Sequence, residues 1–198
     1  MSDFLIDSVL GVAAENAIRE LLSHPENRLK LYSLIPDRLA AFESVSDVKS
    51  QKSGIDLLGE QVSPVRLSIK SRRELAWKLH CKHDLLVEVR HRWMDMPPGV
   101  AFSSRVPWLG WLYDTKADVI IYCGYEKSLI YPVYMLNWCK WKPWVLENLE
   151  SFPENDTSKE GGTRMNGGAY CTFNRFVPIS RIPPSMYAVI AASSHKLP

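Results

Sequence analysis

The clearest pattern in the chain is a strict alternation of apolar and polar residues over positions 65–70, VRLSIK. Successive side chains of a β-strand point to opposite faces, so this alternation predicts a half-buried strand with a basic, polar face. Residues 84–93 alternate in the same way, with Val87 and Val89 in one set and Glu88 in the other. We expect them to form the next strand of the same sheet.

Apolar residues recur at helical spacing over residues 3–23, which predicts an amphipathic helix that closes at His24-Pro25. Further helices are expected over residues 27–42, with a break at Pro36, and over residues 136–149 and 183–192. The helix at 136–149 contains Pro143, which would break or restart it, and three tryptophans at three-residue spacing, Trp138, Trp141 and Trp144. Such a stripe favours core packing over a platform for stacking bases.

The remaining strands are predicted over residues 119–123, 129–134, 169–176 and 177–180. Pro132 lacks an amide hydrogen and therefore favours an edge position for its strand. Residues 151–168 have loop composition and are the best candidate for a mobile loop. The order of elements predicts an α/β fold with a mixed central sheet flanked by helices, in a single domain spanning residues 1–198.

Composition and charge narrow the function mainly by exclusion. A net charge of +2 is too balanced to indicate nucleic-acid binding by itself, so any basic surface must be local. The four cysteines form no CxxC pair, and the first residues resemble neither a signal peptide nor a membrane span. This favours a reducing, cytoplasmic setting with no membrane partner. No GxxxxGK[ST], GxGxxG or GxSxG motif occurs, so the enzyme classes that depend on these motifs find no support.

Asp56 and Lys70 carry the clearest candidate chemistry. Asp56 precedes a turn-like stretch, and Lys70 lies on the polar face of the strand that follows. A carboxylate and an ammonium group that converge can hold a divalent metal and steady a water molecule or the charge on a phosphate.

These residues resemble the PD-(D/E)XK nuclease superfamily, whose core is an acidic residue, a short hairpin and a strand that carries (D/E)-x-K. The match is to Gly54-Ile55-Asp56 followed by Ser68-Ile69-Lys70. The resemblance implies a restriction-endonuclease-like core and an endonuclease that cleaves DNA with Mg²⁺ or Mn²⁺. Ser68 departs from the pattern, because a hydroxyl is a poorer ligand for a hard cation than the carboxylate expected at this position.

Two other acids could complete the site that the resemblance implies. Glu88 could replace the carboxylate absent at position 68 if its strand pairs beside residues 65–71 with the same face toward the site. Its alternatives are a cross-strand ion pair and a second alignment in which Glu88-Val89-Arg90 is itself the (D/E)-x-K strand. Glu15 matches a glutamate that family members often carry on the first helix and that points at the metal; its alternative is a surface position.

A further stretch resembles phage- and mobile-element-type members of the superfamily, with GW, then K-A-D, then an apolar strand that ends in Tyr. Here these residues are Gly110-Trp111, Lys116-Ala117-Asp118 and Tyr122. We expect Lys116 to contact a phosphate and Asp118 to orient it or a metal-bound water, unless Asp118 simply caps the strand and pairs with Lys116. The remaining contacts to the DNA backbone are expected from three basic side chains, Arg66, Arg72 and Arg73.

The sequence leaves two functions open. An active nuclease would hold the metal with Asp56 and with Glu88 or Glu15, and would position the attacking water with Lys70. The alternative is a nuclease fold with an inactive centre that binds nucleic acid or a protein partner, which Ser68 favours. A homodimer is compatible with either function.

Overall fold

The computed structural model describes residues 3–35, 42–44, 57–59, 65–72, 84–95, 108–125, 127–156, 163–165 and 168–190. Its helices are α1 (Asp3–Ser23), α2 (Pro25–Leu34), α5 (Trp111–Asp114) and α6 (Trp138–Asn148), with short 3-10 helices at Leu149–Ser151, Ile179–Arg181 and Pro184–Met186. Its strands are β1 (Phe42–Ser44), β2 (Leu57–Gly59), β3 (Arg66–Arg72), β4 (Asp84–Asp95), β5 (Trp108–Leu109), β6 (Val119–Tyr125), β7 (Leu129–Asn137), β8 (Glu154–Asp156), β9 (Thr163–Met165), β10 (Gly168–Pro178) and β11 (Tyr187–Ile190).

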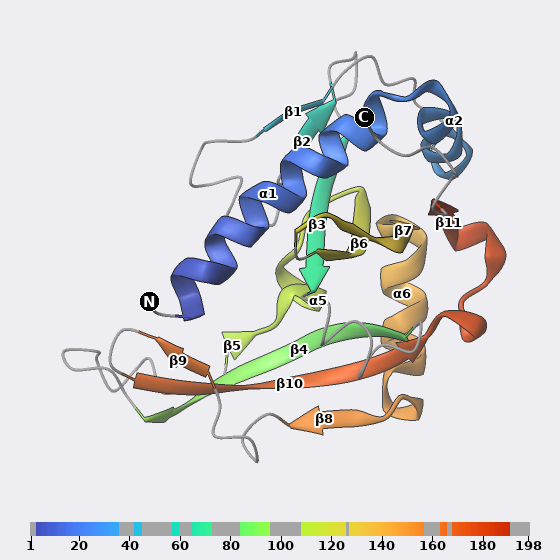
Figure 1. Ribbon diagram of the computed structural model, residues 1–198. Helices are drawn as coiled ribbons and strands as arrows, with labels where there is room; N and C mark the ends of the chain where they lie inside the picture. The colour runs from blue at the N-terminus through green and yellow to red at the C-terminus, as the bar shows by residue number, and fades with distance from the viewer. Residues whose placement is uncertain are drawn as a thin grey trace.

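A mixed sheet, which we call sheet A, forms the upper part of the molecule in Figure 1. Within the described residues its order is β1-β2-β3-β6-β7-β11. β3 and β6 are parallel, and every other neighbouring pair is antiparallel. β6 is buried at every position but the last, as expected for a strand covered on both faces. The α/β class and the mixed sheet predicted from the sequence are confirmed.

A second sheet, sheet B, is antiparallel and has the order β5-β4-β10-β8, with β9 also paired to β10. The prediction that residues 84–93 form the next strand beside residues 65–70 is therefore wrong. β4 pairs with β10 and β5, whereas β3 pairs with β2 and β6. Alternation predicts a strand and its buried face but does not specify the partner, and the buried strand β6 takes the place beside β3.

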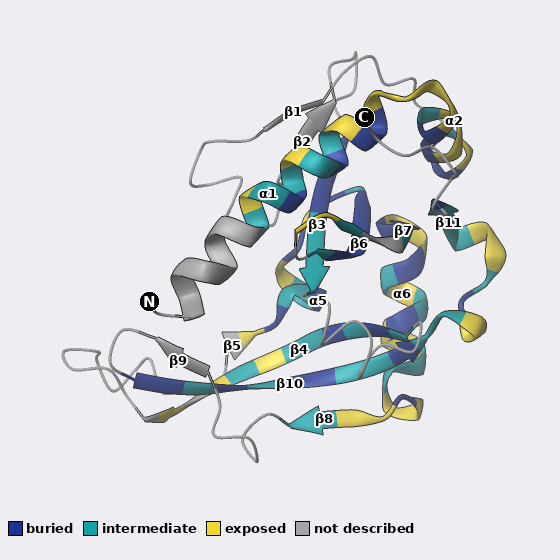
Figure 2. Ribbon diagram, in the orientation of Figure 1, coloured by how far each residue is buried: buried dark blue, intermediate teal, exposed yellow. Residues whose placement is uncertain are grey.

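The central strand β6 of sheet A is buried on both faces, whereas the end of β3 and most of β11 are half-buried (Figure 2). α1 and α2 cover the face that carries Leu67 and Ile121, to which α1 contributes Ile18. The other face, which carries Ile120 and Tyr122, packs against α6 and against the buried side of β4. The layers are therefore α1 and α2, then sheet A, then α6 together with sheet B.

The tryptophan stripe of α6 lies in this second core. Trp138 and Trp141 are buried and Trp144 is half-buried, which confirms the prediction of core packing. Pro143 lies inside the helix, which runs from Trp138 to Asn148 without the predicted break.

Asn137 fixes the start of α6 and ties it to α2. Its side-chain oxygen accepts a hydrogen bond from the backbone N of Lys140 at 3.1 Å, and its Nδ2 donates to the backbone oxygen of Leu34 at 2.6 Å. Leu34 is also where α2 ends, before the break predicted at Pro36; residues 36–41 lie outside the described part of the chain.

The prediction that Pro132 marks an edge strand is wrong, because β7 lies between β6 and β11. The pairing of β7 with β6 shifts register between Tyr122 and Gly124, and the pairing with β11 reaches only to Val133. Pro132 therefore lies beside an irregularity of the ladder, where a missing N–H is tolerated.

The C-terminal part contains more strand than its composition predicts. The helix predicted over residues 183–192 is wrong, since Pro184–Met186 form one 3-10 turn and Tyr187–Ile190 form β11. The stretch 151–168, predicted as a loop, contains β8 and β9. The strands predicted over 169–176 and 177–180 are one strand, β10, which ends at Pro178 before the 3-10 helix Ile179–Arg181. Local composition misses these strands because their pairing partners β7 and β10 supply the ladder. None of the described helices combines the length and the apolar character needed to cross a membrane.

Candidate functional site

The C-terminal end of β3 brings two basic side chains toward sheet B. Lys70 and Arg72 are paired in register with Tyr122 and Gly124 of β6, and they alternate with the apolar face that α1 covers. Because paired positions of neighbouring strands share a face, Lys70 lies on the same side of sheet A as Tyr122. This is the side against which β4 packs.

The hydroxyl of Tyr122 connects the two sheets at this point. Its oxygen accepts a hydrogen bond from the backbone N of Leu86 in β4 at 3.0 Å and one from Nε of Arg72 in β3 at 3.3 Å. Tyr122 itself is fully buried. Leu86 is two residues from Glu88 along β4, so this contact brings Glu88 toward the end of β3.

Glu88 is a half-buried carboxylate surrounded by positive charge. His91 Nε2 lies 2.9 Å from Glu88 Oε1, and the side chains are 12% and 22% exposed, respectively. Burial by itself would raise the pKa of the Glu88 carboxyl. The hydrogen bond from His91 opposes this, and the charges of His91, Arg72 and Lys70 add to its effect, so the pKa of this carboxyl falls below its ordinary value. Glu88 is therefore ionised at neutral pH, within electrostatic reach of Lys70 and Arg72.

Trp111 and Gly110 border the same region from the start of α5. The ammonium nitrogen of Lys70 lies 5.6 Å from the centre of the Trp111 ring, which is within range of a cation–π contact. The backbone N of Gly110 donates to the oxygen of Val89 at 2.8 Å, next to Glu88 in β4. Trp111 thus lies beside Lys70, and Gly110 lies beside the backbone next to Glu88.

Ser68 lies on the same face of β3 as Lys70 and is fully buried. Its Oγ makes no hydrogen bond to any described residue, and the same is true of Trp111 Nε1. The position where the resemblance expects a second carboxylate is thus occupied by a small, enclosed hydroxyl. In this surrounding an ionised acid would need a compensating cation.

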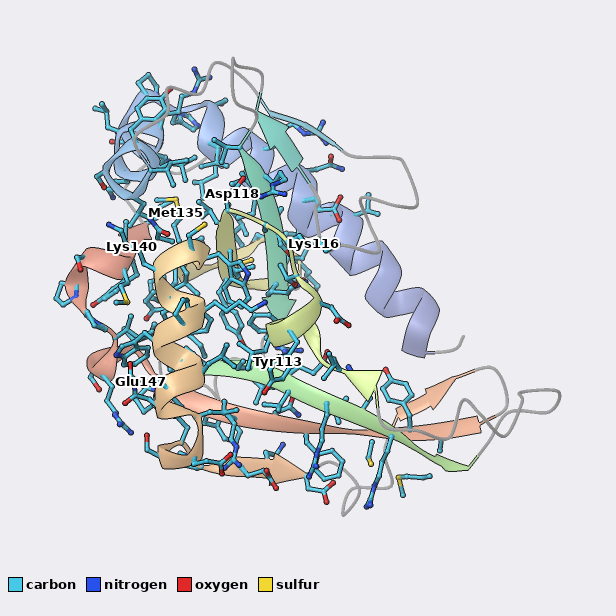
Figure 3. The ribbon with its side chains drawn as sticks, turned by 180° about the vertical axis from the view of Figure 1, so that it is seen from behind. Tyr113, Lys116, Asp118, Met135, Lys140 and Glu147 are labelled. Carbon is cyan, nitrogen blue, oxygen red and sulfur yellow. The ribbon has the colours of Figure 1, made fainter. Side chains whose placement is uncertain are left out.

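Arg66 and Asp118 hold together the other ends of β3 and β6. Arg66 Nη2 lies 2.7 Å from Asp118 Oδ1, and the backbone N of Arg66 donates to Asp118 Oδ2 at 2.8 Å. The backbone N of Asp118 donates in turn to the oxygen of Arg66 at 2.8 Å. This placement gives both residues a structural role and gives no support to their predicted contacts with DNA. The ion pair of Asp118 is with Arg66, and Lys116 is exposed to solvent (Figure 3).

Glu15 lies on α1, on the opposite side of sheet A from Lys70. The buried residues of α1 pack on the face that carries Leu67, whereas Lys70 is paired with Tyr122, whose side chain lies on the other face. Nothing in this placement favours Glu15 as a ligand shared with Glu88. Asp56 and Arg73 lie outside the described residues.

The chemistry of the described side chains fits a Mg²⁺ or Mn²⁺ site only in part. In the portion of the chain that the structure describes, no group of three or more His, Cys, Asp or Glu residues could hold a metal ion. Of the predicted ligands, Glu88 lies beside Lys70 as a single carboxylate. A metal site at this place therefore depends on Asp56 and stays a prediction.

His91 and the linking role of Tyr122 are the site features that sequence patterns did not indicate. In a regular strand, residues three apart point to opposite faces, so Glu88 and His91 give no signal as a pair. Tyr122 is marked in the sequence only as the end of an apolar strand, and its hydroxyl contacts depend on how the two sheets pack.

No family model matches the chain, and no curated protein or solved structure matches it either. The class is therefore given by the fold, an α/β protein in which a mixed sheet packs against helices on one face and against an antiparallel sheet and a helix on the other. Because one fold can carry many activities, function must be argued from the site.

Proposed function

We propose that the chain is a divergent nuclease of the PD-(D/E)XK type, a metal-dependent endonuclease that hydrolyses phosphodiester bonds in DNA. The observation that carries the proposal is that β4 packs across the end of β3 through the hydroxyl of Tyr122, which brings Glu88 of sheet B toward Lys70 and Arg72 of sheet A. Their electrostatic coupling contributes to the lowered pKa of Glu88. A carboxylate that reaches the site from β4 can serve in place of the acid that Ser68 does not supply.

The order of strands in sheet A supports the same proposal. β1, β2 and β3 form an antiparallel series, and β6 then joins β3 in parallel, with α1 on one face. Asp56 immediately precedes β2 in the sequence, and Leu57 of β2 pairs with Leu67 of β3. An acid, a hairpin and a lysine-bearing strand are the order that the resemblance implies.

Each residue of the described site has a role in this proposal. Lys70 orients the attacking water and stabilises negative charge on the phosphate, and Arg72 binds a phosphate oxygen beside it. Glu88 with Asp56 would hold Mg²⁺ or Mn²⁺. The bound ion would supply a more acidic water and offset the charge of the scissile phosphate.

A plasmid-nicking assay in Mg²⁺ or Mn²⁺ tests the proposal. Wild-type protein should convert supercoiled plasmid to the nicked form, and Glu88→Gln, Lys70→Ala and Asp56→Ala should each lower the rate by at least about 100-fold, the scale of losing one charge-stabilising group. The matched controls are Glu147→Gln and Lys140→Ala, exposed positions of α6 (Figure 3), which should leave the rate unchanged. Nicking that persists in Glu88→Gln and Lys70→Ala would come from a contaminant or from another site and would refute the assignment.

The second candidate is a nuclease fold without cleavage activity that binds nucleic acid. The buried hydroxyl of Ser68 favours it, because the described residues supply one carboxylate where the resemblance expects more. A gel-shift assay separates the two: binding of DNA that is weakened by Arg72→Ala, without nicking in either metal, would support the binding module.

A further inference from the structure

A β-bulge in β4 places His91 on the same face as Glu88. In the pairing of β4 with β10, Glu88 is opposite Asn174 and Arg90 is opposite Phe173, so Val89 has no partner of its own. A regular strand would send residues 88 and 91 to opposite faces. One extra residue between them restores a common face, and Nε2 of His91 lies 2.9 Å from Oε1 of Glu88.

Gly110 holds this bulge in place. Its backbone N donates to the oxygen of the bulged residue, Val89, at 2.8 Å. A Cβ atom at Gly110 would lie 2.3 Å from the carbonyl oxygen of Glu88, closer than real Cβ contacts come. The φ of Gly110 is −79°, which any residue adopts, so the glycine is needed for space. The backbone that follows Glu88 is thus fixed by β5 and by Gly110, at the start of α5.

The imidazole of His91 is itself held by β10. Thr172 is the cross-strand partner of His91, and the ring of Tyr170 lies 5.8 Å from the imidazole ring at an angle of 60°. The side chain of His91 is only 12% exposed, so it contacts the Glu88 carboxylate from the protein interior. Its hydrogen bond restrains one carboxylate oxygen and so limits rotation of the carboxyl group.

We propose that His91 is a positioning residue that holds the Glu88 carboxylate in a single orientation toward Lys70, and that the bulge at Val89 exists to bring the two side chains together. The inference rests on the proposed nuclease function for its consequence in catalysis. The contact itself can be tested without activity. His91 touches no substrate in this proposal; it acts through Glu88.

The first measurement is ¹⁵N NMR of the histidine side chains. We expect a slowly exchanging proton on Nε2 of His91, identified because His91→Gln removes its signal, and we expect Glu88→Gln to shift that signal. His24, which is exposed before α2, provides the comparison and should show neither property. A His91 signal that does not respond to Glu88→Gln would overturn the proposal whether or not the protein cleaves DNA.

The second measurement compares His91→Gln with His91→Leu in the nicking assay. Glutamine keeps an N–H donor at a similar reach and should retain kcat within a few-fold, whereas leucine should lower kcat by about 10–100-fold, the usual effect of removing a group that orients a ligand. KM for plasmid should stay nearly constant, because Lys70 and Arg72 still meet the phosphates. The control is His24→Leu, which should match wild type.

Each failure has its own signature. Wild-type kcat in His91→Leu, or an equal loss in His91→Gln and His91→Leu with both folded by circular dichroism, would overturn the positioning role and leave the nuclease proposal standing. A wild-type protein that shows the His91–Glu88 signal but no nicking in either metal would reject the nuclease function, while the contact that the positioning role requires would still be established.

Discussion

Replacing Gly110 by alanine should destabilise the protein and disturb the backbone at Glu88. The added Cβ would lie 2.3 Å from the oxygen and 2.5 Å from the carbon of the Glu88 carbonyl, where real Cβ contacts stay beyond 3.0 Å. Both atoms belong to the backbone of a paired strand, so no side chain can rotate away. β4 and the turn at Gly110 must separate by about 0.7 Å to reach that limit.

Two effects of the substitution lower the free energy of unfolding, and one raises it. Overpacking a rigid contact costs about 1–3 kcal/mol. Stretching the hydrogen bond from Gly110 N to Val89 O loses a further 0.5–1.5 kcal/mol, roughly. Alanine restricts the unfolded chain and returns about 0.4–1 kcal/mol, since the φ of −79° suits it. The free energy of unfolding should therefore fall by about 0.5–4 kcal/mol. For a chain of this length that lowers Tm by roughly 1–16 °C.

Gly11→Ala is the matched control, because the same substitution should have the opposite sign there. Gly11 lies inside α1, and a Cβ at this position would meet no atom within 4 Å. Alanine is favoured over glycine in a helix by about 1 kcal/mol, so Tm should rise by a few degrees. Thermal unfolding followed by circular dichroism measures both variants. A Gly110→Ala protein as stable as wild type would show that Gly110 does not approach β4 this closely, and the account of the bulge would fail with it.

Three further outcomes can be checked on the same protein. Tyr122→Phe removes the acceptor for the part-buried N–H of Leu86 and should lower the free energy of unfolding by about 0.5–1.5 kcal/mol in urea titrations; no change would mean that the hydroxyl does not link the sheets. The pKa of Glu88 is lowered because its hydrogen bond and neighbouring positive charges outweigh burial, so Glu88 contributes stability above its ordinary pKa of 4.5 that is lost as pH falls through the lowered value. Glu88→Gln should therefore be less stable than wild type at pH 7, and the gap should close below pH 4.5; a gap independent of pH would contradict the assignment. Burial raises the pKa of Cys123 to about 12, so a thiol reagent should modify exposed Cys139 in the native protein and reach Cys123 only on unfolding, as peptide mass analysis would show.

The elements that could be predicted from the sequence are those whose local pattern agrees with their place in the fold. The alternation over 65–70 became β3, the apolar run at 119–123 became the buried core of β6, and the helical spacing of 3–23 became α1. The tryptophans of α6 lie in or against the second core for the same reason, because three-residue spacing places these side chains on one side of the helix.

Partner choice is the part that could not be predicted. β4 alternates as well as β3 does, but period two is satisfied in any sheet, and the chain places β4 against β10. Three short segments of ordinary composition, β8, β9 and β11, become strands because the backbone N–H and C=O groups of a longer neighbouring strand pair with theirs. The bulge at Val89 leaves no mark in the residue pattern, so the pairing of Glu88 with His91 was out of reach.

The site itself stays a prediction, and one part of its expected geometry, Glu88 on the strand next to Lys70, was wrong. The argument that an acid from another strand could stand in for the one absent at Ser68 required only that Glu88 come near Lys70, and the sequence suggested adjacent strands as the means. The structure achieves the approach by packing one sheet across the end of another, through Tyr122. Within one sheet, the hydrogen bonds between strands set the distance between two charged groups. The distance between Glu88 and Lys70 is set instead by the packing of one sheet on the other. Core substitutions at the junction, such as Tyr122→Phe, should therefore change activity more than their effect on stability alone would predict.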